Sequence, residues 1–206
     1  MRFSRRLLTL IQFVAALVTV FNPQFAFAYD HPLSDEAVRE AYFVGQDVIN
    51  VNKFLSQYFR GLPVPQRGPR VAEIELSTPY AQVVEASALH SVGYSDLQAA
   101  EDYRKRGDYI AVRVKVLFTT TYTNRPDDFW RGVSVGLVQN KKHMAAMSVD
   151  GQPIYASGED GGSWIIGADV FVKFSVSGVG SDSLQVEVVP PEGLPVHATF
   201  DLKSLR

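Results

Sequence analysis

Apolar and polar side chains alternate along the chain after Asp108, and this pattern limits the fold more than any other feature of the sequence. In the stretch YIAVRVKVLF, apolar residues occupy every second position from Ile110 to Val116, and Arg113 and Lys115 lie between them. A period of two is typical of a β-strand that buries one face. Similar stretches occupy residues 129–139, 170–178, 184–190 and 196–202.

A further stretch, MSVDGQPIYA at 147–156, combines a strand-like pattern with an Asp-Gly pair. Asp150 and Gly151 suit a two-residue turn that needs positive φ, so the stretch predicts a hairpin. Six or seven short strands at regular spacing, with no helical pattern between them, favour an antiparallel β-sandwich. We expect it to be immunoglobulin-like in general architecture and to occupy residues 108–206.

Three helices are predicted before this region. The first begins at the N-cap Ser34 and carries apolar residues on more than one side, so other parts of the protein should cover it. The second follows the N-cap Thr78, and the third begins with a capping box formed by Ser95 and Gln98. Their predicted ranges are 34–59, 79–90 and 96–106.

Between the first two helices, residues 70–77 predict a strand that joins the sheet as an edge. It follows a linker at 61–69 that is rich in proline and glycine. The complete pattern predicts an α+β fold. In it, an N-terminal helical region with one strand, over residues 29–107, packs on the C-terminal β-sandwich.

Residues 1–28 have the composition of a signal peptide. Three arginines precede an apolar core from Leu7 to Phe21, and the small residues of Ala26-Phe27-Ala28 suit a signal peptidase. The apolar run is shorter than the roughly 20 residues that span a bilayer. We therefore expect export to the periplasm or the cell exterior, cleavage after Ala28, and no membrane span in the mature chain.

Charge and cysteine content narrow the classes of function. The chain has a formal net charge of −2, and removal of three arginines and no acid leaves −5 on the mature chain. Such a chain is a poor candidate for nucleic-acid binding, which neutralises phosphates with basic residues. The absence of cysteine excludes a disulfide framework, so a hydrophobic core must stabilise the fold.

Three stretches carry a resemblance to known sequences: LSDEAVREAYFVGQ, ELSTPYAQVVE and VGYSDLQAAEDYRKRGD. They resemble stretches of predicted secreted bacterial proteins that have no assigned activity. The resemblance implies export and a single folded unit, and it transfers no catalytic residue to this chain.

The stretch GVSVG matches the G-x-S-x-G motif of serine hydrolases. Asp150, Asp169 and His197 follow Ser134 in the chain, as this class of catalytic triad requires, so an esterase is one alternative. However, β-branched residues continue after the motif, where a nucleophile elbow needs a helix. We interpret the two glycines instead as a bulge or a close backbone approach within a sheet.

Other acids and the histidines give no clear site. Glu73 and Glu75 lie two residues apart and could divide acid and base roles in glycoside cleavage, although charges on an exposed edge strand commonly prevent aggregation. The four histidines are scattered, and Glu159 and Asp160 lack the spacing of a calcium loop. No metal and no cofactor are therefore expected.

Aromatic residues beside two predicted loops are the strongest candidates for ligand binding. Asp127, Asp128, Trp130 and Arg131 lie at the entrance to a strand, and Trp164 follows a glycine-rich loop. Tryptophan and arginine commonly anchor interfaces, and loops at one end of a sandwich commonly bind ligands. Burial of each tryptophan in the core is the competing interpretation.

These observations favour an exported, non-enzymatic binding or interaction protein. Its partner would be a protein or a glycan, and it could form a homo-oligomer. The alternative is a secreted hydrolase that acts on glycosides or esters. A structural component of the cell envelope is a third possibility.

Processing of the chain is directly testable. We predict that the protein purified from its native host begins at Tyr29, because a basic head, an apolar core and an Ala-x-Ala site occur in that order. Intact-mass spectrometry should report the mass of residues 29–206. A mass that includes residues 1–28 would contradict the prediction.

Overall fold

The fold is described from a computed structural model. The structure describes residue 29 and residues 31–63, 68–90, 93–119, 122, 126–158 and 161–206. The expected signal peptide over residues 1–28 lies outside the described residues. Within those ranges, no helix has both the length and the apolar composition needed to cross a membrane.

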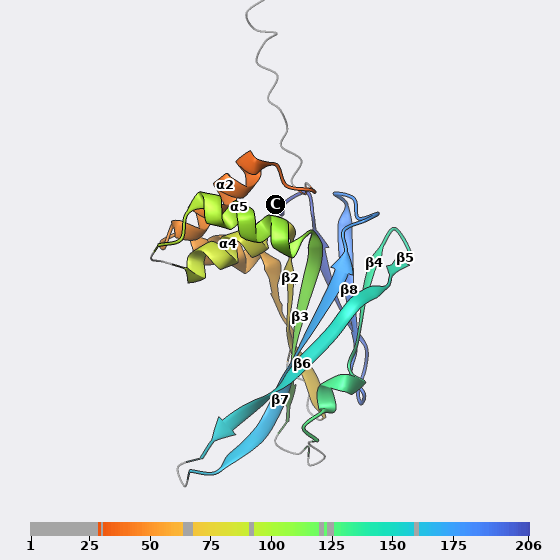
Figure 1. Cartoon of the computed structure of the whole chain (residues 1–206). Coiled ribbons are helices and arrows are strands. Elements are labelled where there is room, and N and C mark those ends of the chain that lie inside the picture. The colour runs from red at the N-terminus through yellow and green to blue at the C-terminus, as the bar shows by residue number, and fades with distance from the viewer. Residues whose placement is uncertain are drawn as a thin grey trace, which may run out of the picture.

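The described residues form an α+β structure, as the sequence predicts. Its α-helices gather at one end of a β-structure (Figure 1). They are α2 (Asp35–Gln46), α3 (Val51–Leu55), α4 (Pro79–Leu89) and α5 (Asp96–Arg106), and the short 3-10 helices are η1 (Ser56–Tyr58) and η2 (Phe129–Gly132).

Two antiparallel sheets form the β-structure. The first has the order β1-β2-β3-β7-β6, and the second has the order β5-β4-β8-β9. The chain therefore crosses between the sheets three times, before β4, before β6 and before β8. The strands are β1 (Phe59–Gly61), β2 (Pro69–Ser77), β3 (Tyr109–Phe118), β4 (Ser134–Gln139), β5 (Lys142–Met144), β6 (Ala146–Ser157), β7 (Ser163–Ser175), β8 (Ser183–Val189) and β9 (Val196–Asp201).

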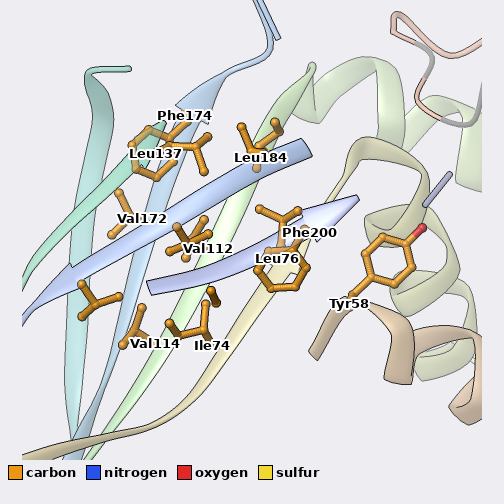
Figure 2. Close-up of a cluster of buried hydrophobic side chains, with 14 of the residues drawn as sticks. Tyr58, Ile74, Leu76, Val112, Val114, Leu137, Val172, Phe174, Leu184 and Phe200 are labelled. Atoms are coloured by element: carbon orange, nitrogen blue, oxygen red, sulfur yellow. The ribbon is translucent and has the colours of Figure 1, made fainter. Parts of the chain in front are cut away.

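The two sheets contribute side chains to one hydrophobic cluster. On β3, the alternation predicted from the sequence is confirmed, because its apolar positions are buried and the positions between them are partly exposed. Figure 2 shows members of the cluster from both sheets: Ile74, Leu76, Val112, Val114, Val172 and Phe174 from the first sheet, and Leu137, Leu184 and Phe200 from the second.

The predicted strand at 70–77 forms β2, but its predicted position at the sheet edge is wrong. β2 pairs with β1 on one side and with β3 on the other, so it lies inside the sheet. Lys115 Nζ lies 2.8 Å from a Glu73 carboxylate oxygen, and Arg113 Nε lies 2.8 Å from a Glu75 oxygen. Each acid therefore faces a cation of the neighbouring strand.

The predicted helix over 34–59 is interrupted at residues 47–50 and continues as α3 and η1. α2 ends at Gln46, and the Asp47 carboxylate accepts hydrogen bonds from the backbone N–H groups of Ile49 (3.1 Å) and Asn50 (3.2 Å). These bonds offer the backbone an alternative to the helical pattern. The chain turns here before α3, and the apolar residues of the turn face solvent.

The other two predicted helices are confirmed. Thr78 caps α4 by accepting a hydrogen bond from the N–H of Ala81 at 3.2 Å. Ser95 and Gln98 form the expected capping box of α5.

Gln82 joins the helices to the first sheet. Its side-chain amide, on α4, donates to the backbone oxygens of Ser77 (3.1 Å) and Tyr109 (2.9 Å), which belong to β2 and β3. The Tyr58 hydroxyl donates to the backbone oxygen of Arg206 (2.7 Å) and accepts from its N–H (3.0 Å). Burial raises the pKa of Tyr58 to about 12, so this hydroxyl remains a donor over the ordinary pH range.

Glu85 lies at the same junction, where its carboxylate accepts a hydrogen bond from the Ser77 hydroxyl at 2.9 Å. Burial raises the pKa of the Glu85 carboxyl above its ordinary value of 4.5, against the opposing effects of Ser77 and of Arg106 and Arg113. A raised pKa in the folded state favours the protonated form. The stabilisation that the protonated Glu85 carboxyl gives the folded state is therefore complete below the ordinary pKa of 4.5. It is lost as the pH rises through the raised pKa of the folded state.

We predict that Glu85→Gln removes this pH dependence, because glutamine keeps an oxygen that can accept from Ser77 and carries no charge. Urea unfolding at several pH values should show the variant gaining stability relative to the wild type as the pH rises from 4 to 8. Glu101→Gln, at an exposed position of α5, controls for the change in net charge. A constant difference between Glu85→Gln and the wild type would contradict the prediction.

Candidate functional site

An apolar groove lies where the first residues of β2 meet the loop between β8 and β9. Its volume is about 640 Å³. Pockets of about 300–1,000 Å³ with mainly apolar walls are typical of ligand sites in proteins. The groove is lined by Leu62, Pro63, Pro69, Arg70, Val71, Pro190, Gly193, Leu194, Pro195, Val196 and His197.

Both walls are extensions of the sheets. The backbone N–H of Leu62 donates to the oxygen of Ala72 at 2.9 Å, so the β1–β2 pairing continues to the groove. On the other wall, an added Cβ at Gly193 would lie 3.8 Å from the backbone oxygen of Pro69. Because β2 and β9 are in contact, the two sheets determine the width of the groove.

Four prolines line the groove. Pro63 and Pro69 lie on one wall, and Pro190 and Pro195 lie on the other. The ring of each proline fixes its φ angle, so these four residues lose less conformational freedom when a ligand binds.

Two residues of the lining, Arg70 and His197, have polar side chains. The Nδ1 atom of His197 lies 3.6 Å from a Glu187 carboxylate oxygen. Arginine donates several hydrogen bonds in a fixed geometry, so Arg70 can hold a carbonyl or carboxylate oxygen. The groove can therefore bury the apolar groups of a ligand, and its polar side chains can orient that ligand by binding a few of its oxygens.

The candidate residues Asp127, Asp128, Trp130 and Arg131 lie together at η2 and do not line this groove. Both aspartates are exposed, and Trp130 is half-buried. The Arg131 guanidinium lies 5.1 Å from the centre of the Trp130 ring, within the range of a cation–π interaction. The preceding Phe129 is buried, so this turn is attached to the core.

The Trp130 ring packs directly on Gly151 of β6. An added Cβ at Gly151 would lie 2.6 Å from Trp130 Cδ2, closer than real Cβ contacts allow. This contact explains why the predicted Asp150-Gly151 hairpin is wrong. Residues 146–157 form one continuous strand, and Gly151 faces Val170 within it because only glycine leaves room for the indole.

Trp164 does not join the other candidate residues. It is 47% exposed on β7, opposite Ala156 of β6. Trp130 lies over Gly151, five residues earlier on β6, a separation of about 17 Å along a strand. The hairpin of β6 and β7 that carries Trp164 extends away from the helices (Figure 1).

The geometry around Ser134 differs from that of a catalytic triad. Ser134 is the first residue of β4, after a 3-10 helix, and the chain continues as a strand rather than a helix. It pairs with Val189 of β8, whereas His197 pairs with Glu187 from the opposite side of that strand. Two strand spacings, about 10 Å, therefore separate Ser134 from His197 across the sheet.

The interpretation of the two glycines beside Ser134 as a bulge or close backbone approach within a sheet is wrong, because Gly132 belongs to η2 and Gly136 pairs in register. An added Cβ at Gly132 would lie 3.0 Å from the Cβ of Pro191, which is a close approach. At Gly136 the nearest atom would be a Glu187 oxygen at 3.8 Å, an ordinary contact. Gly136 is therefore not required by its neighbours.

The charged residues in the described ranges make no metal centre. No three His, Asp or Glu side chains among them lie close enough together to hold a metal ion. Glu159 and Asp160 lie outside the described residues.

The sequence alone did not indicate the groove, because the proline- and glycine-rich residues 61–69, some of which form part of its wall, predict only a linker. The available signal was a second proline-rich stretch, VPPEGLPV at 189–196. The two stretches lie more than 100 residues apart, and only the contact between β2 and β9 brings them together. Comparisons with protein-family models, with curated proteins and with solved structures found no match to this chain.

We predict that Gly151→Ala destabilises the protein by about 1–3 kcal/mol, the usual cost of overpacking. Gly136→Ala is the matched control in the other sheet and should leave stability within about 0.5 kcal/mol. Urea unfolding of both variants tests the difference. If Trp130 is the obstacle, the cost of Gly151→Ala should fall in a Trp130→Ala background. Equal costs in both backgrounds would contradict this explanation.

Proposed function

We propose that this chain is an exported, non-enzymatic binding protein that holds an apolar, extended segment of a protein partner in the proline-walled groove. The groove itself is the observation that carries the proposal. It is concave, and most of its lining is aliphatic or proline. The same chemistry is complementary to the side chains of an extended peptide, and Arg70 is available to a peptide carbonyl oxygen.

A peptide suits this lining better than a glycan. A sugar carries hydroxyl groups on most of its carbons, and burial of each hydroxyl without a hydrogen bond costs free energy. Arg70 and His197 are the polar side chains that the lining offers. An apolar peptide leaves few groups unsatisfied in such a groove.

The arrangement of the candidate catalytic residues supports a role without catalysis. Ser134 and His197 lie on strands separated by β8. Glu73 and Glu75 each form an ion pair with a cation of β3, so both carboxylates already have a partner within the sheet.

The proposal includes two features of the whole molecule. We propose that the two sheets form a β-sandwich of immunoglobulin-like general architecture, and the cluster that they share supports this. We also propose export, which the basic, apolar and small-residue pattern of residues 1–28 supports.

Nuclear magnetic resonance can test the groove directly. We predict that a short apolar peptide, acetyl-Leu-Pro-Val-Leu-amide, shifts the amide signals of Arg70, Gly193 and Val196 in a ¹⁵N-labelled sample. Maltohexaose, the glycan probe, should leave them unchanged. Leu194→Asp places a charge on the groove wall and should raise the Kd of the peptide about tenfold.

Leu194 is 83% exposed, so its replacement should not affect folding. Met147→Asp, at a 65% exposed position on β6, is the control and should change the Kd by less than about twofold. Peptide-induced shifts outside the groove, or a response to maltohexaose alone, would contradict the proposal.

A further inference from the structure

The outer end of the helices exposes an unusual number of large apolar side chains. Val48 is 83% exposed, Ile49 is 87% exposed and Leu89 is 82% exposed. Phe43 and Leu97 are 55% and 65% exposed. We call these five residues the helix-end patch.

Specific contacts bring the five residues to one place. The Gln46 side-chain amide donates to the backbone oxygen of Ser87 at 2.5 Å, and this bond ties the end of α2 to the end of α4. Val48 and Ile49 come after Gln46 and the C-cap residue Asp47, and Leu89 lies in the last turn of α4. The exposed turn and the exposed leucine therefore neighbour each other.

Arg39 connects the remaining two residues of the patch. Its guanidinium lies 5.8 Å from the centre of the Phe43 ring, and its Nε lies 3.3 Å from an oxygen of Asp96. Leu97 follows Asp96 in the first turn of α5. The patch thus extends over three helices.

Aromatic stacking supports the surface beneath the patch. The rings of His90 and Tyr94 are 4.8 Å apart, and those of Tyr94 and Tyr42 are 6.2 Å apart. The Tyr42 hydroxyl also donates to the backbone oxygen of Tyr94 at 2.9 Å. These contacts connect α2 and the residue after α4 to Tyr94, beside the patch.

The size of the patch suits a protein–protein contact. Five side chains of this size at these exposures offer on the order of 600 Å² of apolar surface, the upper limit for the largest patch on a typical monomer. A stable interface buries about 800 Å² on each partner, including its polar rim. The helix-end patch with its rim reaches that area.

The charges around the patch are of both signs. Asp47 and Lys53 lie on either side of the Val48–Ile49 turn, and Arg39, Asp96 and the exposed Glu101 lie near Phe43 and Leu97. An anionic membrane would attract a rim with a surplus of basic residues. The rim has no such surplus, and since it carries both signs, an acid of one copy can meet a base of the other across a two-fold axis.

We propose that the helix-end patch is the contact surface of a homodimer, in which the same patch of a second copy covers it around a two-fold axis. The contact leaves the groove free, since the patch is made by α2, α4, α5 and the turn after α2. This inference does not depend on the proposed function.

Sedimentation equilibrium of residues 29–206 tests the dimer. The wild-type chain should be dimeric above about 10 µM, a dissociation constant within the range for interfaces of this size. The double variant Ile49→Asp/Leu89→Asp should be monomeric throughout, with an unchanged Tm. Met147→Asp adds a charge at an exposed apolar position outside the patch and should remain dimeric. A monomeric wild type, or a dimer that the double variant retains, would overturn the proposal.

Cross-linking provides a second measurement that does not rely on a charged variant. The chain has no cysteine, so Ile49→Cys introduces one thiol per chain. A short bis-maleimide should join two copies of this variant and should not join two copies of Met147→Cys. Cross-linking of both variants to the same extent would indicate random encounters and contradict the proposal. Flotation of a monomeric wild type with phosphatidylglycerol vesicles would also contradict it and assign the patch to a membrane surface.

Discussion

Burial of one face of β3 is the constraint on which the rest of the structure depends. β3 lies in the middle of its sheet, between β2 and β7, and its inward residues are covered by the second sheet. Shifting the register by one residue would turn Arg113 and Lys115 toward the core, where unpaired charges are costly. On the outer face, the ion pairs of Arg113 and Lys115 with Glu75 and Glu73 favour the same register, because they align β2 with β3.

The helices depend on this sheet more than on their own hydrogen bonds. α3 is five residues long and could not persist alone in water. Tyr58 and Gln82 connect the helical group to backbone groups of the sheet and of the last residue described. β2 and β3 therefore determine how the helices are oriented and which surfaces the helices present.

Local signals in the sequence predicted the elements that local interactions determine. Caps and apolar spacing were sufficient for α4 and α5, and strict alternation was sufficient for β3. The end of α2 was missed because Asp47 resembles any polar surface residue until its carboxylate is seen to accept two backbone hydrogen bonds. Gly151 was misread as part of a turn because its partner, Trp130, is 21 residues away in the chain.

The candidate groove was the least predictable feature for the same reason. Proline marks a segment that cannot continue a helix or a central strand, and it gives no information about what lies opposite. Two such segments become one surface only when β2 and β9 meet. Of the candidate binding residues, Asp127, Asp128, Trp130 and Arg131 lie together because they are close in the sequence. Trp164 lies apart from them, because a sequence alone does not determine the distance between two loops.

The three crossings of the chain between the sheets have a consequence for folding kinetics. Neither sheet is built from consecutive strands alone, since β4 and β5 separate β3 from β6, and β6 and β7 separate β5 from β8. Most stabilising contacts are therefore non-local, and proteins of high contact order fold slowly. Phe200 and Leu202, which complete the core, lie within the last seven residues of the chain. A chain without β9 thus lacks part of the cluster that both sheets share, and folding has to wait until β9 is available.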